Sequence, residues 1–157
     1  MSVQTASGVK FYIGPQNNVA DDTTAYGLLS YTEVAEVANI GEFGDAFNEV
    51  NFTALSDSRV RKFKGSVNAG TLSEELGLDV SDAGQDAIET ARDATAANSQ
   101  EYAFKVELND SGGTNPTTYY FRGLVMSYTV NPGEVESIVG STVAIGINSQ
   151  VVVLDAA

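Results

Sequence analysis

The 157-residue sequence contains no cysteine, no histidine and no tryptophan. Without cysteine, the chain has no disulfide framework, no thiolate nucleophile and no cysteine-bound zinc. Without histidine, it has no Ser-His-Asp triad, no imidazole acid–base catalyst and no histidine-bound metal. These absences argue against the common enzyme chemistries, so we expect no catalytic residues, no metal site and no cofactor.

Positive charge is also scarce, because eight Lys and Arg residues stand against 21 Asp and Glu, for a formal net charge of −13. Tight binding to a phosphate backbone needs clustered Lys and Arg, which this balance opposes. The chain has no apolar run of about 18 residues, so no membrane-spanning helix is expected. A chain of this length is expected to fold as a single domain over residues 1–157.

Motifs that carry chemistry are few. The sequence contains no P-loop, no dinucleotide-binding glycine motif and no nucleophile elbow. Two carboxylate pairs, Asp21-Asp22 and Glu74-Glu75, are candidates for acid–base work. Because adjacent side chains usually diverge, we interpret both pairs as solvated charge.

Alternation of apolar and polar residues dominates the chain and is typical of half-buried strands. Strands are expected at residues 9–13, 48–55, 101–109, 117–130 and 135–147. The sequence Asn131-Pro132-Gly133 predicts a turn that joins the last two strands as a hairpin. Whether residues 72–78 form a strand stays open, because Glu74 falls on the same face as the leucines of this segment.

One segment has the spacing of a helix. Over residues 82–95 the chain is rich in alanine, and its apolar residues follow a narrow helical stripe. Ser81 or Asp82 can cap the first turn. The small residues allow close approach to a sheet. We therefore expect a mainly β protein, an antiparallel β-sandwich or barrel with one flanking α-helix at about 82–95.

A basic cluster interrupts the acidic chain and holds half of its positive charge within six positions: Arg59, Arg61, Lys62 and Lys64. One interpretation is a solvated loop or a charged edge strand. The other is a surface that docks on an acidic partner, including another copy of the chain, with Phe63 as an apolar anchor. We expect this cluster on a long loop or extended hairpin at about 57–70.

Several segments of the sequence resemble the tail tube proteins of bacteriophages with long, non-contractile tails. The resemblance is carried by FGDAFNEVNF (43–52), DSRVRKFKGS (57–66), NAGTL (68–72), LGLD (76–79), YAFKV (102–106) and TYYFRGLVMSY (118–128). It covers most of the chain after about residue 30. It implies a β-sandwich or barrel with one flanking helix, the fold shared with the tube subunit of type VI secretion.

The resemblance also implies a function. Such proteins are structural virion proteins that assemble into stacked hexameric rings, and the tube conducts DNA through an acidic lumen without binding it specifically. Expected partners are other copies, contacted through Arg59, Arg61, Lys62, Phe63 and Lys64, and the tape-measure, tail-terminator and tail-tip proteins. No membrane partner is expected. The protein would be made in the host bacterial cytoplasm and located in the phage tail. Apart from the resemblance, residues 1–8 are polar and small and lack periodicity, so a flexible N-terminal arm is expected there.

A second class of function remains open from the sequence. A soluble β-sandwich binding module, an adhesin or a carbohydrate-binding domain, would stack sugars on exposed tyrosines. The candidates are Tyr26, Tyr31, Tyr119 and Tyr120. Their strand context favours packing in the core or against neighbouring strands instead.

Overall fold

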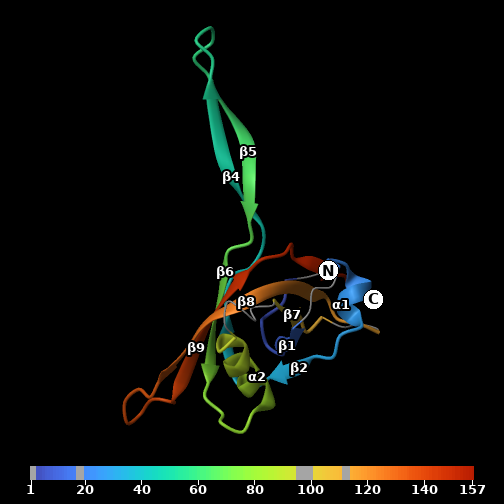
Figure 1. Ribbon diagram of the computed structural model, residues 1–157, viewed down its shortest axis with the longest axis vertical. Coiled ribbons are helices and arrows are strands. Elements are labelled where there is room, and N and C mark those ends of the chain that lie inside the picture. The colour runs from blue at the N-terminus through green and yellow to red at the C-terminus, as the bar shows by residue number, and fades with distance from the viewer. Residues whose placement is uncertain (1–2, 17–19, 95–100, 111–113) are drawn as a thin grey trace.

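The computed structural model describes residues 3–16, 20–94, 101–110 and 114–157 (Figure 1). Within these residues the chain forms ten strands and two helices. In chain order they are β1 (Lys10–Gln16), α1 (Thr23–Gly27), β2 (Thr32–Val34), β3 (Val37–Ile40), β4 (Ala46–Thr53), β5 (Val60–Asn68), β6 (Thr71–Gly77), α2 (Ala83–Arg92), β7 (Tyr102–Glu107), β8 (Thr118–Asn131), β9 (Gly140–Ile147) and β10 (Val152–Leu154).

Eight strands form one antiparallel sheet in the order β2-β1-β7-β8-β9-β6-β3, with β10 added beside β8. The long strand β8 links the two halves of this sheet, because its first part pairs with β7 and its second with β9. The register on β9 shifts between Val125 and Ser127, which marks an irregularity in β8. The expected antiparallel β-sandwich with a flanking helix is confirmed.

The core contains three stacked phenylalanines from neighbouring strands. Phe104 of β7 lies between Phe11 of β1 and Phe121 of β8, with ring centroids 5.8 and 5.5 Å away. All three rings are fully buried. Alternation predicted β7 correctly. Phe104 and Val106, two residues apart, lie on the same face of this strand, and both are buried.

The predicted helix is confirmed as α2. Asp82 caps it by accepting a hydrogen bond from the Gln85 backbone N–H at 3.0 Å, and its carboxylate also accepts from Ala35 N–H at 3.1 Å. A Cβ at Gly84 would overlap the backbone of Glu33 and Val34, so only glycine permits this close packing on β2. The helix ends at Arg92, before the expected limit, and residue 95 lies outside the described residues.

The second helix, α1, was not predicted. Asp22 caps it by accepting from Ala25 N–H at 2.6 Å, and Asp21 pairs with Arg122 of β8 at 2.9 Å. The interpretation of this carboxylate pair as merely solvated charge is therefore wrong. A helix of five residues is too short to show a periodic apolar stripe.

Residues 72–78, whose structure the sequence left open, lie mostly in β6, which pairs with β3 and β9 on its two sides. Leu72, Glu74 and Leu76 all point into the core and are at most 3% exposed. The interpretation of Glu74 as solvated charge is wrong, because the alternation of β6 carries it inward with the leucines. Glu75, on the opposite face, is exposed as expected.

Strands β8 and β9 form the expected hairpin, but the predicted alternation over 135–139 is wrong. After Pro132 the chain makes a second turn, in which Ser137 N–H donates to the Glu134 carbonyl at 3.0 Å. Pairing with β8 begins only at Gly140. Residues 132–139 are all exposed and form no strand.

At the N-terminus, residues 3–8 form neither helix nor strand, and residues 1–2 lie outside the described residues. A hydrogen bond from the Asn109 side-chain amide to the Ser7 carbonyl, 3.2 Å long, holds the end of this segment near β7. The flexible arm expected over 1–8 stays a prediction.

Candidate interaction surface

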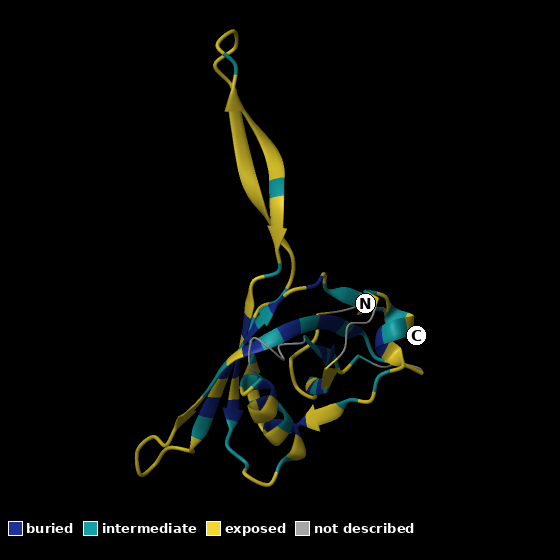
Figure 2. Cartoon of the chain, viewed as in Figure 1, coloured by how far each residue is buried: buried dark blue, intermediate teal, exposed yellow. Residues whose placement is uncertain are grey.

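The antiparallel hairpin of β4 and β5 projects from the body as a separate two-stranded sheet (Figures 1 and 2). Every residue of its two strands is exposed except Gly65, which is half-buried. An isolated two-stranded hairpin is marginally stable in water, since it lacks a face that another element covers. Its exposure therefore identifies it as the first candidate for contact with another molecule.

Residues 57–70 were expected as a long loop or extended hairpin. They supply part of the tip at 54–59 and the whole of β5 in an extended hairpin whose other strand, β4, begins at Ala46. Residues 48–55 were expected to be a half-buried strand. They belong almost entirely to β4, whose alternation is real but whose faces are both uncovered.

Strand pairing divides the basic cluster between the two faces of the hairpin. Directly opposite residues share a face, and the register places Val50 opposite Phe63 and Phe52 opposite Arg61. Lys64 and Lys62 lie on the other face, opposite Glu49 and Asn51. The predicted contact residues are thus neighbours on one hairpin, but they form two half-apolar, half-basic faces rather than a single patch.

Each cation on the strands has a weak partner within the hairpin. The Lys62 Nζ atom lies 3.4 Å from a Glu49 carboxylate oxygen, and Lys64 Nζ lies 4.8 Å from the ring centroid of Phe47. Exposed pairs of this kind contribute at most about 1 kcal/mol and are screened by salt. Both lysines can therefore exchange these contacts for those of a partner at small cost.

At the tip, Asp57 organises the turn. Its carboxylate accepts a hydrogen bond from the Arg59 backbone N–H at 3.0 Å and pairs with the Arg61 guanidinium at 2.7 Å. These two contacts, the backbone bond first, lower the pKa of Asp57 below its ordinary value. Ser58, between them, has a φ of 48°, in the left-handed region. Among the described residues, the Arg59 guanidinium has no partner.

The hairpin also carries large apolar side chains that are each at least half exposed: Phe47, Val50, Phe52, Leu55, Val60, Phe63 and Val67. Only Phe63 was singled out from the sequence. The signal for the others was present, since two alternating apolar segments flank a short polar turn at 54–59. What the sequence could not show is that no part of the chain covers them. Exposed apolar side chains on both faces make the hairpin a candidate interaction site.

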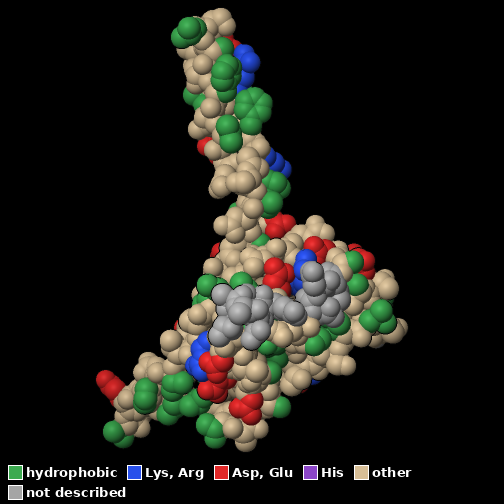
Figure 3. Space-filling view, viewed as in Figure 1, with side chains coloured by type: hydrophobic (Ala, Val, Ile, Leu, Met, Phe, Trp, Pro, Cys, Tyr) green, Lys and Arg blue, Asp and Glu red, His purple; other side chains and the backbone are tan. Residues whose placement is uncertain are grey.

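Charge is distributed very unequally between the hairpin and the body (Figure 3). Residues 46–68 contain four basic and two acidic side chains, for a net charge of +2. The rest of the chain contains four basic and 19 acidic side chains, for a net charge of −15. The hairpin of one copy is therefore electrostatically complementary to the body of another.

The tyrosines proposed as sugar-stacking platforms are used in packing. Tyr26 of α1 and Tyr120 of β8 are buried, with their rings stacked at a centroid distance of 5.4 Å. Tyr31 packs on Tyr120 at 6.1 Å, and Tyr119 meets the ring of Phe43 edge-on at 5.2 Å. Burial raises the pKa of Tyr26 and Tyr31. The packing interpretation is confirmed, and the binding-module alternative loses its supporting observation.

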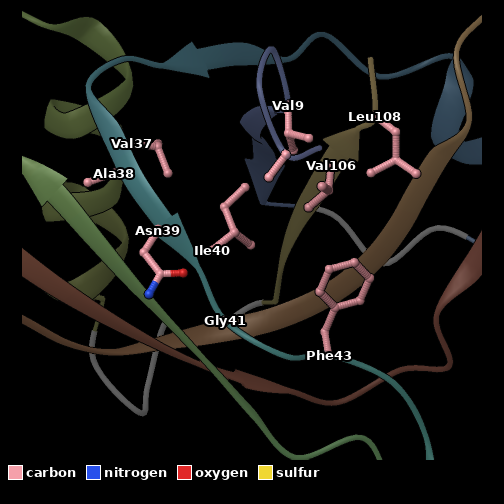
Figure 4. A pocket seen from close by; sticks show the side chains of 10 residues that line it. Val9, Val37, Ala38, Asn39, Ile40, Gly41, Phe43, Val106 and Leu108 are labelled. Atoms are coloured by element: carbon pink, nitrogen blue, oxygen red, sulfur yellow. The ribbon is translucent and has the colours of Figure 1, made fainter. Parts of the chain in front are cut away.

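A pocket of about 280 Å³ opens beside β3 and is the other candidate site (Figure 4). Its lining is mainly aliphatic, with side chains such as Val9, Ile40, Val106 and Leu108 pointing into it, and Asn39 is its polar contribution. No charged side chain lines it. It offers no acid–base pair, and the described part of the chain holds no cluster of potential metal ligands. None of the helices described here is long and apolar enough to cross a membrane.

No family model matches the chain, and no curated protein sequence matches it either. Solved structures do match. A chain in the sheath/tube terminator (PVC) of an extracellular contractile injection system superimposes with a TM-score of 0.71 at 8% identity, over 98% of both chains. A chain of the native gene transfer agent virion gives 0.63 at 14% identity, over 97% of this chain and 99% of the other.

The tail tube of SPP1 gives a TM-score of 0.60 at 18% identity, over 90% of this chain and 74% of that one. Identities this low establish the fold alone. The fold is that of tail tube proteins, and the resemblance indicated by the sequence is confirmed at this level.

Proposed function

We propose that this protein is a structural tail tube subunit that assembles with copies of itself into stacked hexameric rings. The observation that carries the proposal is the uncovered hairpin, which combines seven exposed apolar side chains with a net charge of +2 on a body of −15. A second copy supplies both the apolar cover and the negative charge. Burial of apolar area gives the affinity, at about 25 cal/mol per Å² removed from water.

The charge of the body suits a conduit for DNA. A ring of copies that each carry −13 has a strongly negative wall, which repels phosphate and prevents the long-lived contacts that Lys and Arg would make. The same repulsion opposes assembly, so apolar contact and the basic hairpin must offset it. In this role the protein is a virion component without catalytic activity, and its partners are other copies and the tape-measure, tail-terminator and tail-tip proteins.

The test is reversal of the basic cluster. The triple variant Arg59→Glu, Arg61→Glu and Lys64→Glu is expected to abolish tubes in negative-stain electron microscopy. The three reversals change the net charge of the hairpin by −6, from +2 to −4, so it repels the acidic body of another copy. The circular dichroism spectrum and melting temperature should stay nearly unchanged, since all three side chains are exposed.

A matched control separates the effect of charge on the hairpin from the effect of the net charge of the whole chain. The single variants Arg59→Glu and Lys10→Glu change the net charge equally, and both side chains are exposed, but Lys10 lies on β1 of the body. Arg59→Glu should shorten tubes more than Lys10→Glu. Tubes of normal length from the triple variant would show that the cluster is only solvated charge.

A further inference from the structure

The loop between β8 and β9 is acidic where the hairpin is basic, and like the hairpin it exposes apolar side chains. We define the acidic loop as residues 132–139, which contain Glu134 and Glu136 and no Lys or Arg. Three of its aliphatic side chains, Val135, Ile138 and Val139, are exposed, the first two by 102% and 85%. In Figure 1 the loop lies at the lower left, at the opposite end of the molecule from the hairpin tip.

The acidic loop is shaped by its own hydrogen bonds, and its last residue is hydrogen-bonded to the segment that follows β6. Gly133 N–H donates to the Asn131 side chain at 3.1 Å, and Gly133 has a φ of 73°, which favours glycine. Ser137 N–H donates to the Glu134 carbonyl, and Leu78 N–H donates to the Val139 carbonyl at 2.9 Å. The loop therefore presents its side chains on a defined backbone.

We propose that the acidic loop is the surface that receives the hairpin of a second copy, an assignment that rests on the proposed function and names the receiving site. Charge complementarity supports it, since the hairpin has a net charge of +2 and the loop −2. Both surfaces also expose large apolar side chains, so contact removes apolar area from water on each side.

Some carboxylates of the body are engaged within the chain. Asp21 pairs with Arg122, Asp82 caps α2, and Glu107 pairs with Lys105 at 3.0 Å. By contrast, the side chains of Glu134 and Glu136 have no ion-pair or hydrogen-bond partner in the part of the chain that the structure describes. A cation from another molecule can pair with them without displacing an internal contact.

The experiment exchanges the two charges. One variant reverses the loop (Glu134→Lys, Glu136→Lys), a second reverses the hairpin (Arg59→Glu, Arg61→Glu), and a third combines all four changes. Each reversal alone should slow tube growth, followed by light scattering and electron microscopy, by at least about tenfold because like charges meet at the contact. The combined variant, and an equimolar mixture of the two single reversals, should recover growth.

The control is Glu75→Lys with Asp155→Lys, which changes the net charge as much as the loop reversal at two exposed sites elsewhere. Melting of every variant is checked by circular dichroism. If the loop reversal grows tubes like the wild type while the hairpin reversal does not, the loop assignment is wrong and the proposed function stands. Failure of the combined variant and of the mixture to recover growth also overturns the assignment. If the wild type forms neither rings nor tubes, the proposed function fails with it.

Discussion

Glu74 of β6 lies directly opposite Val143 of β9, and both side chains are fully buried. Neither carboxylate oxygen of Glu74 has a hydrogen-bond partner among the described residues. Ser141, two residues from Val143 on β9, has a buried hydroxyl that is likewise unpartnered in this part of the chain. Burial raises the pKa of Glu74 to about 8, so the folded protein holds this carboxyl in its neutral form near neutral pH.

The raised pKa predicts that stability falls as pH rises. The pKa of Glu74 moves from an ordinary value of 4.5 to about 8 on folding. Between these values the folded chain keeps a proton that the unfolded chain has released, so unfolding becomes easier by up to about 1.4 kcal/mol per pH unit. Below 4.5 both states are protonated, and above about 8 the loss is complete.

Replacing the carboxyl tests this dependence. Glu74→Gln should flatten the decline of the urea-unfolding free energy between pH 5 and pH 8, as measured by circular dichroism. Glu75→Gln is the control, because Glu75 is the exposed neighbour on the same strand. An equal decline in the wild type and the Glu74 variant would show that the decline comes from other groups.

A side chain at Gly84 should disturb the packing of α2 on β2 and so lower stability. Gly84→Ala should lower the free energy of unfolding by roughly 1–3 kcal/mol, because the new methyl group meets the backbone of Glu33 and Val34 and forces α2 away from β2. Gly27→Ala at the end of α1 is the matched control, since a methyl group added there would meet no other atom within 4 Å. Urea unfolding compares the two, and equal effects would contradict the role of close packing.

Removing apolar side chains from the hairpin should weaken assembly without lowering the stability of the monomer. Phe52→Ser and Phe63→Ser should reduce assembly in sedimentation and electron microscopy, because a partner then covers less apolar surface. The melting temperature of the monomer should change little, since both rings are 55% exposed. Val153→Ser, at a 45% exposed position on β10, should leave assembly intact. A large loss of melting temperature in the phenylalanine variants would mean that the hairpin is covered within the monomer.

Salt predicts a maximum in the rate of assembly. Copies with a net charge of −13 repel one another, so moderate salt should speed growth by screening that repulsion. Higher salt should slow it, because the contacts of the basic hairpin are screened in turn. Light scattering against ionic strength measures the rate, and a steady fall from the lowest salt would mean that attraction exceeds repulsion throughout.

The sequence predicted the parts of the fold in which local pattern and burial agree. Phe104 and Val106 alternate inward on β7, and the alanine-rich stripe of α2 packs against the sheet, so the period of each pattern reports a real interior face. Alternation says nothing about what covers a face. For that reason β4 was expected to be half-buried although it is uncovered, and residues 135–139 were expected to pair although they lie in a loop.

The candidate site was predicted in part for the same reason. Charge clustering is visible in sequence, so Arg59 and its neighbours were found, but their distribution over two faces follows from strand register, which depends on the partner strand. The acidic loop was not recognised in the sequence, because only the structure shows that Glu134 and Val135 are exposed together in a loop. The burial of Glu74 was missed although its place on the leucine face was visible, because the sequence did not show that this segment is a strand covered on that face.

The placement of the hairpin and the acidic loop at different ends of the molecule gives any array built from this contact a polarity. When the two surfaces lie at opposite ends of the molecule the contact is head-to-tail, so copies add in one orientation, and the array stays open unless the rotation closes it into a ring. One end of the array then shows unoccupied basic hairpins, and the other shows unoccupied acidic loops. A protein that stops growth at the hairpin end needs an acidic, apolar surface, whereas one that starts or stops it at the loop end needs a basic one, so the two ends would select different partners.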